Sequence, residues 1–459
     1  MVSFWVYDVA FLVLFSVFII WVIKKNRENM NREGIIFMWR TQFGVNAIKY
    51  IGDNFKKTLH ALKYVIVGIG FVLMGAMIWM LGQTVVIYLL HPEITKLIKA
   101  PPIAPLIPYF PKLFGMESFF PPFYFTYFIV ALAIVAVVHE FSHGVFMRLF
   151  KVKIKSTGLV FLGPILGAFV EQDDRSFQKK SNLQQMTVLA AGVFANIVFA
   201  LIFYGLYVGF FFSSFAASGY IFNTYGVSAV PLENITGFNE SGDLLKVMTA
   251  NGTYYLDEGL AIQLNQSNGE YLIAYPEAPA VLAGMKGAII QADDVKITGQ
   301  DKLREFLENK HPGDRVIFMT EDIEGVKEYN ILLSEHPEYS SRAYLGVGHS
   351  ENEPRGIIQK TLAKFMSFKD SSTLYKPTWD GEFVYFVYHL LWWVMIINLL
   401  VALFNMMPLG MLDGGRFFYL TILSIFKSEK IAKAAYKISG YIILFAFILL
   451  MFFWFIRII

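Results

Sequence analysis

The sequence predicts a polytopic α-helical membrane protein of about six spans, with a soluble α+β domain inserted between spans four and five. Of the 459 residues, 56% are hydrophobic and only 16% are charged, whereas soluble globular proteins have about 25% charged residues. Long apolar runs lie towards both ends of the chain, and the composition of residues 213–382 is that of a folded soluble domain. These observations place the chain in the membrane class.

Six segments are apolar enough and long enough to cross a bilayer, which takes about 20 helical residues. They are residues 4–23, 64–90, 122–149, 187–212, 383–408 and 438–457. The first lacks the positive n-region and the small-residue cleavage site of a signal peptide, so we expect a retained helix. The spans divide the chain into an N-terminal membrane region (1–212), an inserted region (213–382) and a C-terminal membrane region (383–459).

Basic residues predict the orientation of these spans. They gather in the loops between spans one and two, three and four, and five and six, which all fall on one side of a six-span arrangement. That side is expected to be cytoplasmic, so both termini and residues 213–382 are expected outside. The sequons at Asn234, Asn239, Asn251 and Asn265 all lie in this outer region, as glycosylation would require. The net charge of +3 is not concentrated in a tail, so no nucleic-acid partner is expected.

Two segments beside the membrane leave alternatives open. Residues 91–122 are dense in proline, which favours a stiff connector, although a lid over the membrane site is the alternative. Residues 361–380 mix apolar and charged residues, as is typical of an amphipathic anchor on the lipid bilayer. Guiding substrate is the alternative role for that second segment.

His139, Glu140 and His143 stand in "VVHEFSHGVF", at the end of the third span. Two histidines four residues apart share one face of a helix and can bind one Zn²⁺. The glutamate beside them could take a proton from an attacking water. Ionisable groups are costly in a membrane, so we expect a functional role, with a hydrogen-bonded core cluster as the alternative. The chain has no cysteine, so any metal must rest on His, Asp or Glu.

A catalytic zinc normally has three protein ligands, and Asp413 in "NMMPLGMLDGG" is the candidate for the third. The glycines around it interrupt the helical pattern, and irregular backbone at membrane depth is tolerated where it lines a cavity. Taken alone, the stretch favours a helix cap or a surface turn. When the stretch is considered together with the two histidines, a metal ligand becomes the favoured interpretation of Asp413.

Together, these two motifs resemble those of the site-2 protease family of intramembrane zinc metalloproteases. The resemblance implies one zinc ion per chain, bound by His139, His143 and Asp413, with Glu140 as the catalytic glutamate. The family pattern Asn-x-x-Pro-x-x-x-x-Asp-Gly begins here at Asn405, which implies that this asparagine holds the substrate backbone. A proline often found before the family's LDG is replaced by glycine in this chain.

Two other stretches are similar to family segments near the substrate. "GPILGAFV", which contains Gly163 and Gly167, resembles a membrane-inserted hairpin or sheet whose edge could bind an unwound substrate. "AGVFAN", which ends at Asn196, resembles the family's AGPxxN stretch, with Val193 in place of the usual proline. For this stretch, close helix packing is the alternative to a direct role in the site.

Residues 276–348 alternate strand-like runs with turns and contain one helix-like segment, "DKLREFLENK". Their order resembles a PDZ domain of the protease-associated type, which implies binding of peptide segments at a sheet edge. Residues 213–275 extend this domain or form a second one.

The resemblance implies hydrolysis of peptide bonds in or near transmembrane segments, as in regulated intramembrane proteolysis. The substrates would be membrane proteins that another protease has already cut, and the active site would lie towards the cytoplasmic leaflet. One alternative is a membrane zincin of the prenyl-protein type, which the LDG motif and the PDZ-like insert disfavour. The other is a non-proteolytic metal-binding scaffold or transporter with a peptide-binding PDZ-like domain. The intact Glu140 and the absence of a repeated transporter-like half disfavour it.

Overall fold

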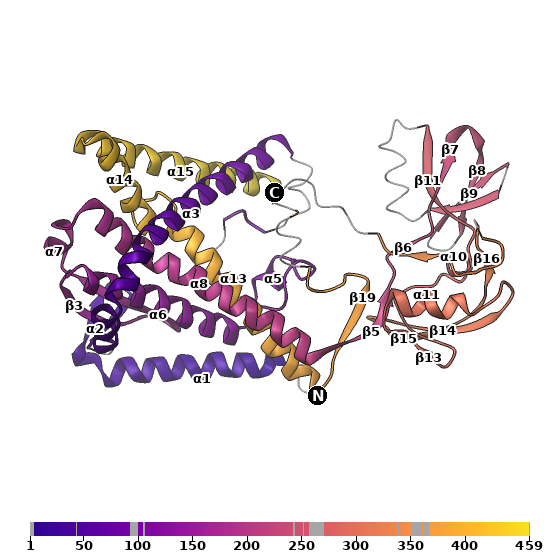
Figure 1. The fold of residues 1–459 in the computed structure, drawn as a ribbon, viewed down its shortest axis with the longest axis horizontal. Helices are drawn as coiled ribbons and strands as arrows, with labels where there is room; N and C mark the ends of the chain where they lie inside the picture. Colours follow the sequence, from indigo (N-terminus) through magenta and orange to yellow (C-terminus); the bar gives the residue numbers. More distant parts are fainter. Residues whose placement is uncertain are drawn as a thin grey trace. The chain divides into compact units, whose positions relative to one another are not determined.

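The computed structural model describes residues 4–42, 44–91, 100–103, 106–241, 244–250, 252–256, 270–337, 339–350, 360 and 367–458. The chain forms two compact units: a membrane unit of Met1–Phe210 with Tyr385–Ile459, and an inserted unit of Phe211–Val384. Long helices dominate the first unit and strands dominate the second (Figure 1). The sequons at Asn251 and Asn265 lie outside the described residues, as do parts of the proline-dense and amphipathic segments.

Six described helices are long and apolar enough to cross a membrane, which confirms the predicted number. They are α1 (Phe4–Lys25), α3 (Lys56–Leu90), α6 (Phe125–Leu149), α8 (Asn182–Ser214), α13 (Gly381–Asn405) and α15 (Glu429–Ile458). Helices α3 and α15 begin eight or nine residues before the predicted spans, because polar, lysine-containing turns continue them beyond their apolar parts. Helix α13 stops at Asn405 rather than at residue 408, since Pro408 cannot continue a helix.

Shorter elements complete the membrane unit. The helices are α2 (Val45–Asn54), α5 (Phe110–Leu113), α7 (Asp174–Gln178), α14 (Asp413–Phe426) and the 3₁₀ turn η1 (Arg27–Asn29). An antiparallel sheet in the order β1-β2-β3-β4 consists of β1 (Met30–Glu33), β2 (Ile36–Thr41), β3 (Ile154–Leu162) and β4 (Ile165–Gln172). The stretch "GPILGAFV" thus supplies the β3–β4 turn and most of β4, with Gly163 in the turn at a φ of +57°. β4 lies at the edge of the sheet.

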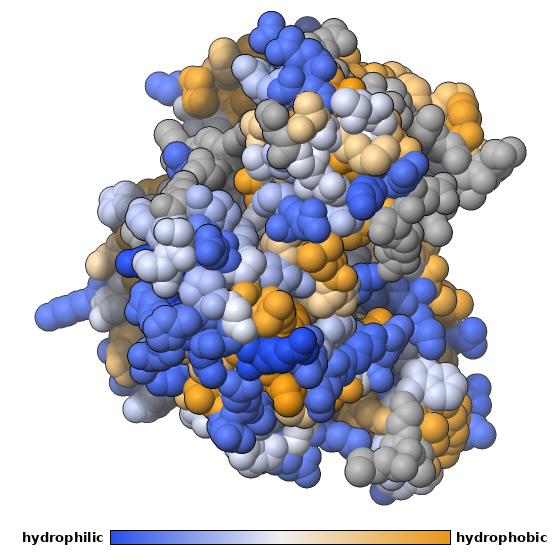
Figure 2. Space-filling view, turned by 90° about the vertical axis from the view of Figure 1, so that its right-hand side faces the viewer, coloured by the Kyte–Doolittle hydropathy of each residue, from blue (hydrophilic) through white to orange (hydrophobic). Residues whose placement is uncertain are grey.

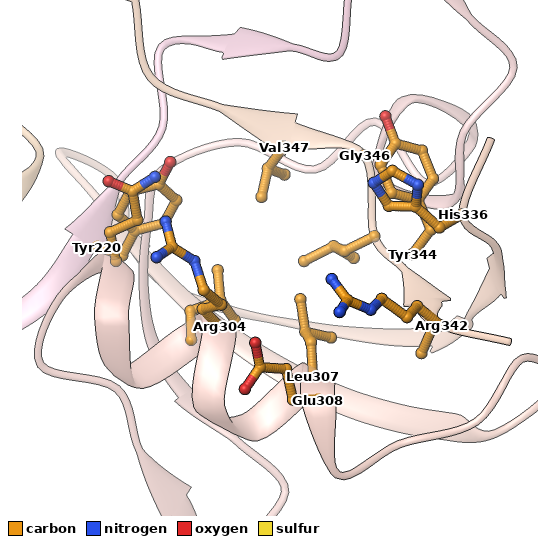
Figure 3. A pocket seen from close by; sticks show the side chains of 13 residues that line it. Tyr220, Arg304, Leu307, Glu308, His336, Arg342, Tyr344, Gly346 and Val347 are labelled. Carbon is orange, nitrogen blue, oxygen red and sulfur yellow. The ribbon is translucent and has the colours of Figure 1, made fainter. Parts of the chain in front are cut away.

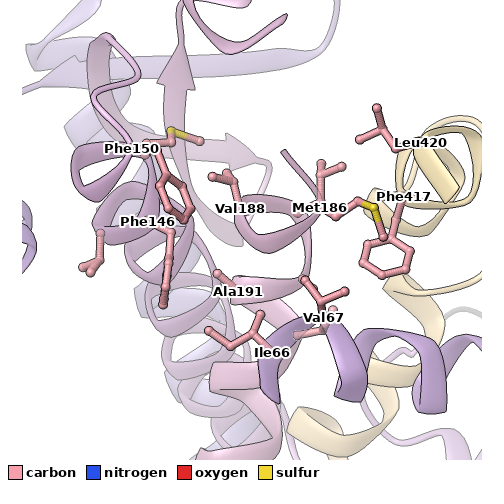
Figure 4. Packing of buried hydrophobic residues seen from close by; sticks show 14 of the residues in the cluster. Ile66, Val67, Phe146, Phe150, Met186, Val188, Ala191, Phe417 and Leu420 are labelled. Atoms are coloured by element: carbon pink, nitrogen blue, oxygen red, sulfur yellow. The ribbon is translucent and has the colours of Figure 1, made fainter. Parts of the chain in front are cut away.

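The main core of the membrane unit lies where α3, α6, α8 and α14 meet. Ile66 of α3, Phe146 of α6, Ala191 of α8 and Phe417 of α14 are all buried in this cluster (Figure 4). Close-packed interiors respond to changes as small as one methylene group. This packing therefore fixes the relative positions of three helices, α6, α8 and α14, that carry the site described below.

A buried carboxylate on α1 fixes the start of α6. Asp8 is 1% exposed and accepts hydrogen bonds from the backbone amides of Phe125 (2.8 Å) and Thr126 (2.9 Å). The hydroxyl groups of Thr126 and Tyr109 also donate to it, at 2.6 and 2.5 Å. The first amides of a helix have no partner within the helix, and the helix dipole favours a negative charge there. An acidic residue inside the first span therefore serves as the cap of the third.

The inserted unit has a main sheet covered by a helix. Its strands run in the order β15-β14-β12-β5-β19, with β13 paired to β12. These strands are β5 (Phe215–Ile221), β12 (Ala288–Ala292), β13 (Val295–Lys296), β14 (Arg315–Asp322), β15 (Gly325–Leu332) and β19 (Thr373–Pro377). The helices are α10 (Pro279–Leu282) and α11 (Gln300–Glu308). Leu303 and Phe306 of α11 are buried against Val316 and Phe318 of β14.

A second sheet, in the order β7-β11-β10-β9-β8, is inserted between β6 and β12. Its strands are β7 (Ser228–Pro231), β8 (Ile235–Ser241), β9 (Leu244–Thr249), β10 (Gly252–Leu256) and β11 (Tyr271–Pro276), with η2 (Leu232–Asn234) between β7 and β8. It has a small core of its own around Val247 and Leu256. Two short pairs, β6 (Thr224–Tyr225) with β18 (Val347–Gly348) and β16 (Ser334–Glu335) with β17 (Ala343–Tyr344), complete the unit. The face seen in Figure 2 is largely hydrophilic.

Candidate metal centre

Helix α6 presents His139, Glu140 and His143 together. The two histidines are one turn apart on the same face, both are buried, and their Nε2 atoms are 3.0 Å from each other. One imidazole nitrogen of each histidine and one carboxylate oxygen of Glu140 lie within 4.8 Å of one another. The local spacing in the sequence thus brings three possible ligands to one place.

Asp413 reaches the same place from the other end of the chain. Helix α13 ends at Asn405, the chain turns through "MMPLGML", and α14 begins at Asp413 itself. Its Oδ2 lies 3.2 Å from Nε2 of His139 and 3.3 Å from Nε2 of His143. The N-terminus of α14 favours a carboxylate at this position. The helix-start and metal-ligand interpretations of "LDGG" are therefore compatible.

The three atoms fit the ligand set of a zinc ion. A tetrahedral zinc with bonds of about 2.0–2.1 Å has its ligand atoms about 3.3 Å apart. The two Nε2 atoms and Oδ2 of Asp413 are separated by 3.0, 3.2 and 3.3 Å. Two imidazoles and one carboxylate form a donor set that is usual for catalytic zinc, which keeps a fourth position open.

Glu140 is the second carboxylate beside the histidines, and its contacts differ from those of Asp413. Its Oε2 accepts a hydrogen bond of 2.9 Å from the backbone amide of Val170 on β4. Because Asp413 is within 3.3 Å of both Nε2 atoms and Glu140 is already engaged with β4, Asp413 is the better third ligand. Glu140 is then left beside the ligand set as a possible proton acceptor.

Helix α8 supports both histidines from behind. Nδ1 of His143 lies 2.7 Å from the carbonyl oxygen of Val188. That oxygen can only accept, so Nδ1 carries a proton, which leaves Nε2 as the ring atom that can bind a metal. Nδ1 of His139 lies 3.1 Å from the side-chain amide of Asn196, which is fully buried. Metal-binding histidines usually have such partners at the other ring nitrogen.

Gly192, between these two contacts on α8, leaves no space for a side chain. A Cβ atom at this position would lie 2.6 Å from Nε2 of His143 and 2.7 Å from Nε2 of His139. The imidazoles can therefore occupy their positions only because residue 192 is glycine.

A cavity of about 360 Å³ opens onto these groups. Its lining comprises His139, Glu140, His143, Met147, Val170, Gln172, Val188, Leu189, Asn405, Met411, Leu412 and Asp413. Of the expected substrate-binding residues, Asn405 lines this cavity, whereas Asn196 lies behind His139. Gly163 and Gly167 belong to the β3–β4 hairpin but do not line it; their hairpin contributes Val170 and Gln172 instead.

Three contributors escaped the sequence analysis: the carbonyl of Val188, the amide of Val170 and the missing side chain of Gly192. Two of them are backbone groups, which no side-chain pattern reveals. Gly192 lies within "AGVFAN", so the small residues of that stretch were the available signal. The structure assigns this glycine to contact with the two histidines.

The inserted unit has a separate cavity of about 300 Å³ between α11 and residues 342–347. Arg304 of α11 and Arg342, just before β17, approach it from opposite sides (Figure 3). Leu307 and Val347 add apolar surface, and His336 lies at its rim beside Tyr344. Glu308 also lines the cavity, which therefore offers apolar surface and charges of both signs.

Comparisons with known proteins found a family profile and individual relatives that match this chain. The profile of Peptidase family M50 matches residues 127–451. "Uncharacterized protein MJ0971" of Methanocaldococcus jannaschii is 42% identical over 74 residues, which are 16% of this chain and 20% of the relative. "Putative zinc metalloprotease CPE1693" of Clostridium perfringens is 25% identical over 327 residues, which are 67% of this chain and 85% of the relative. The match thus spans a fifth of the archaeal relative and most of the bacterial one.

Proposed function

The chain belongs to peptidase family M50, the site-2 protease family, and on that premise we propose that it is a zinc metalloendopeptidase that cuts peptide bonds in or near transmembrane segments. The observation that carries the proposal is the convergence of His139, His143 and Asp413 within 3.0–3.3 Å. These residues belong to a multi-pass membrane protein, in whose described part six helices are long and apolar enough to cross a membrane. Glu140 beside them supplies the remaining group that peptide hydrolysis needs.

Each residue has a distinct part in the proposed reaction. Nε2 of His139, Nε2 of His143 and Oδ2 of Asp413 would hold one zinc ion. Zinc bound there would lower the pKa of water towards about 7 and polarise the scissile carbonyl group. The carboxylate of Glu140 would take the proton from the attacking water and then deliver it to the leaving nitrogen.

The edge of β4 is the proposed place for the substrate backbone. A transmembrane helix hides its amides in internal hydrogen bonds, so the segment must unwind before it is cut. The amide of Val170 points away from β3, because it donates to Glu140. Outward-pointing groups recur at every second residue of an antiparallel strand, so Ala168 and Gln172 also offer theirs. An unwound substrate could add to this edge as a further strand, and Asn405, which lines the same cavity, would contact it.

The basic loops support an orientation with the active site towards the cytoplasmic leaflet. His139 lies in the C-terminal half of α6 and Asp413 follows the C-terminal end of α13, and these are the ends of the two helices that border basic loops. In this arrangement the inserted unit is extracytoplasmic. A role in regulated intramembrane proteolysis follows if the substrates have already lost their outer domains to another protease.

A second proposed role, peptide binding in the PDZ-like unit, rests on the cavity between α11 and residues 342–347. Arg304 and Arg342 favour a peptide that carries a carboxylate. In titrations of the full chain with such a peptide, we expect Arg342→Glu to weaken binding at least tenfold. Arg315→Glu, an exposed change outside the cavity, should have no effect. Equal binding by the wild type and Arg342→Glu would refute this role.

The proposed activity can be tested in liposomes that contain the purified chain and a single-span protein. Mass spectrometry should locate a cut within or beside the apolar segment, and a substrate lacking its outer domain should be cut faster. Glu140→Gln should abolish cleavage while the chain still binds zinc. A protein that binds zinc but cuts none of a panel of single-span substrates would instead favour a metal-binding scaffold or transporter.

A further inference from the structure

Asn196 is fully buried behind His139 and lines no part of the cavity. Its Nδ2 lies 3.1 Å from Nδ1 of His139. Its Oδ1 is buried and has no hydrogen-bond partner within the described part of the chain. Buried polar atoms without a partner are rare in folded proteins, so this oxygen calls for an explanation.

The tautomer of His139 decides which amide atom faces Nδ1 and which one is left without a partner. With Nδ2 of Asn196 donating to Nδ1, His139 must carry its own proton on Nε2, the atom that faces Asp413 at 3.2 Å. A metal needs the lone pair of Nε2, so the proton must then be on Nδ1. A half-turn of the amide group about χ2 exchanges Oδ1 and Nδ2, and Oδ1 then accepts from that Nδ1–H group.

We propose that Asn196 is the positioning residue of this site, with an amide that turns to support the Nδ1-protonated tautomer of His139. The proposal rests on the proposed zinc function. In it, Asn196 supports the zinc ligand His139 and does not contact the substrate. The neighbouring histidine has the same arrangement, since Nδ1 of His143 faces the carbonyl oxygen of Val188 at 2.7 Å. One histidine is thus oriented by a main-chain carbonyl and the other by a side-chain carbonyl.

An amide suits this position better than a carboxylate or a hydrocarbon. It donates to His139 in one orientation and accepts in the other, so it can satisfy both tautomers of the imidazole. An aspartate could only accept, which would support the metal-binding tautomer alone. A leucine of similar shape could do neither, and it would leave Nδ1–H buried without a partner.

Zinc affinity of the full-length chain in detergent, measured by competition with a chelator, tests the proposal. Loss of an outer hydrogen-bond partner typically costs 10–100-fold in metal affinity, and we expect that loss for Asn196→Leu. Asn196→Asp should bind zinc within about tenfold of the wild type, because its oxygen still accepts from Nδ1–H. Asn398→Leu is the matched control, since Asn398 is also fully buried in the membrane unit and also has an unpartnered Oδ1.

Two results would overturn the proposal. One is wild-type zinc affinity in Asn196→Leu. The other is an Asn196→Asp chain that loses as much affinity as Asn196→Leu, which would show that an oxygen accepting from Nδ1–H does not sustain the zinc affinity. Thermal unfolding of the zinc-free variants separates misfolding from loss of the ligand contact, and any zinc comparison uses variants that unfold like the wild type. A wild-type chain that binds zinc but cleaves nothing would refute the protease function and leave this test intact.

Discussion

A single methyl group on α8 should disable the metal centre. In Gly192→Ala the new Cβ would lie 2.6 Å from Nε2 of His143 and 2.7 Å from Nε2 of His139. Non-bonded carbon and nitrogen atoms need about 3.5 Å, so the imidazoles or α8 must move by about 0.8–0.9 Å. Ligand distances in metal sites tolerate only about 0.2 Å. The required shift is therefore about four times the tolerance.

We expect zinc affinity to fall at least about 100-fold in Gly192→Ala, which corresponds to about 2.7 kcal/mol at 1.36 kcal/mol per tenfold change. The assay is chelator competition on the purified chain, together with peptide cleavage at limiting zinc. Gly205→Ala is the control, because Gly205 is on the same helix and a Cβ there would meet no atom within 4 Å. Unchanged zinc affinity in Gly192→Ala, or an equal loss in Gly205→Ala, would refute the geometric reasoning.

Three further predictions concern β4, the cap of α6 and the inserted unit. Val170→Pro removes the amide that contacts Glu140 and should reduce kcat/KM at least tenfold in the cleavage assay. Ala168→Pro, at an equivalent edge position, leaves the hydrogen bond to Glu140 in place and should reduce kcat/KM less. Equal reductions in the two variants would contradict the specific role of Val170. Asp8→Ala should lower the free energy of unfolding of the membrane unit by about 1–3 kcal/mol, measured by thermal denaturation in detergent, and an unchanged melting temperature would contradict the cap. Burial opposes the charge of Asp293, but the hydrogen bonds from Lys310 and from the amide of Ile317, together with the charge of Lys310, outweigh it and lower the pKa of that carboxyl group. The stabilisation is then complete above the ordinary pKa of about 3.9 and is lost as the pH falls through the lower folded value, so Asp293→Asn should cost about 0.5 kcal/mol at pH 7 and progressively less at pH values below 3.9.

The six spans and the histidine pair were predictable because they depend on local information. Apolar runs of sufficient length identify membrane helices, and the spacing of His139 and His143 places them on one helical face. Helix ends were less accurate, since α3 and α15 continue through polar turns. Hydrophobicity marks the membrane, whereas backbone hydrogen bonds decide where a helix ends.

The rest depends on contacts between distant segments. Residues 24–63 read as a basic loop, but they contain β1, β2 and α2, and β2 pairs with β3 more than 110 residues later. These strands are short and carry charged residues, so they lack a clear alternation of apolar and polar positions. The five-stranded sheet of the inserted unit was likewise not predicted, because the sequence did not decide whether residues 213–275 extend the neighbouring domain or form a second one.

The candidate site likewise combines residues that a local motif identifies with contacts that only the folded chain reveals. Asp413 was identified through its motif and not through physical pattern, since "LDGG" alone favours a turn. The partners of the histidines on α8, 45 and 57 residues away in sequence, became visible only when the helices were packed together. Asn196 in particular lies behind a zinc ligand rather than in the cavity, a distinction that spacing cannot make.

The zinc content of the purified chain shows whether His139, His143 and Asp413 hold one metal ion. We predict about one zinc per wild-type chain. An Asp413→Ala chain that still unfolds like the wild type should retain almost none after dialysis. A full equivalent of zinc in Asp413→Ala would contradict the account.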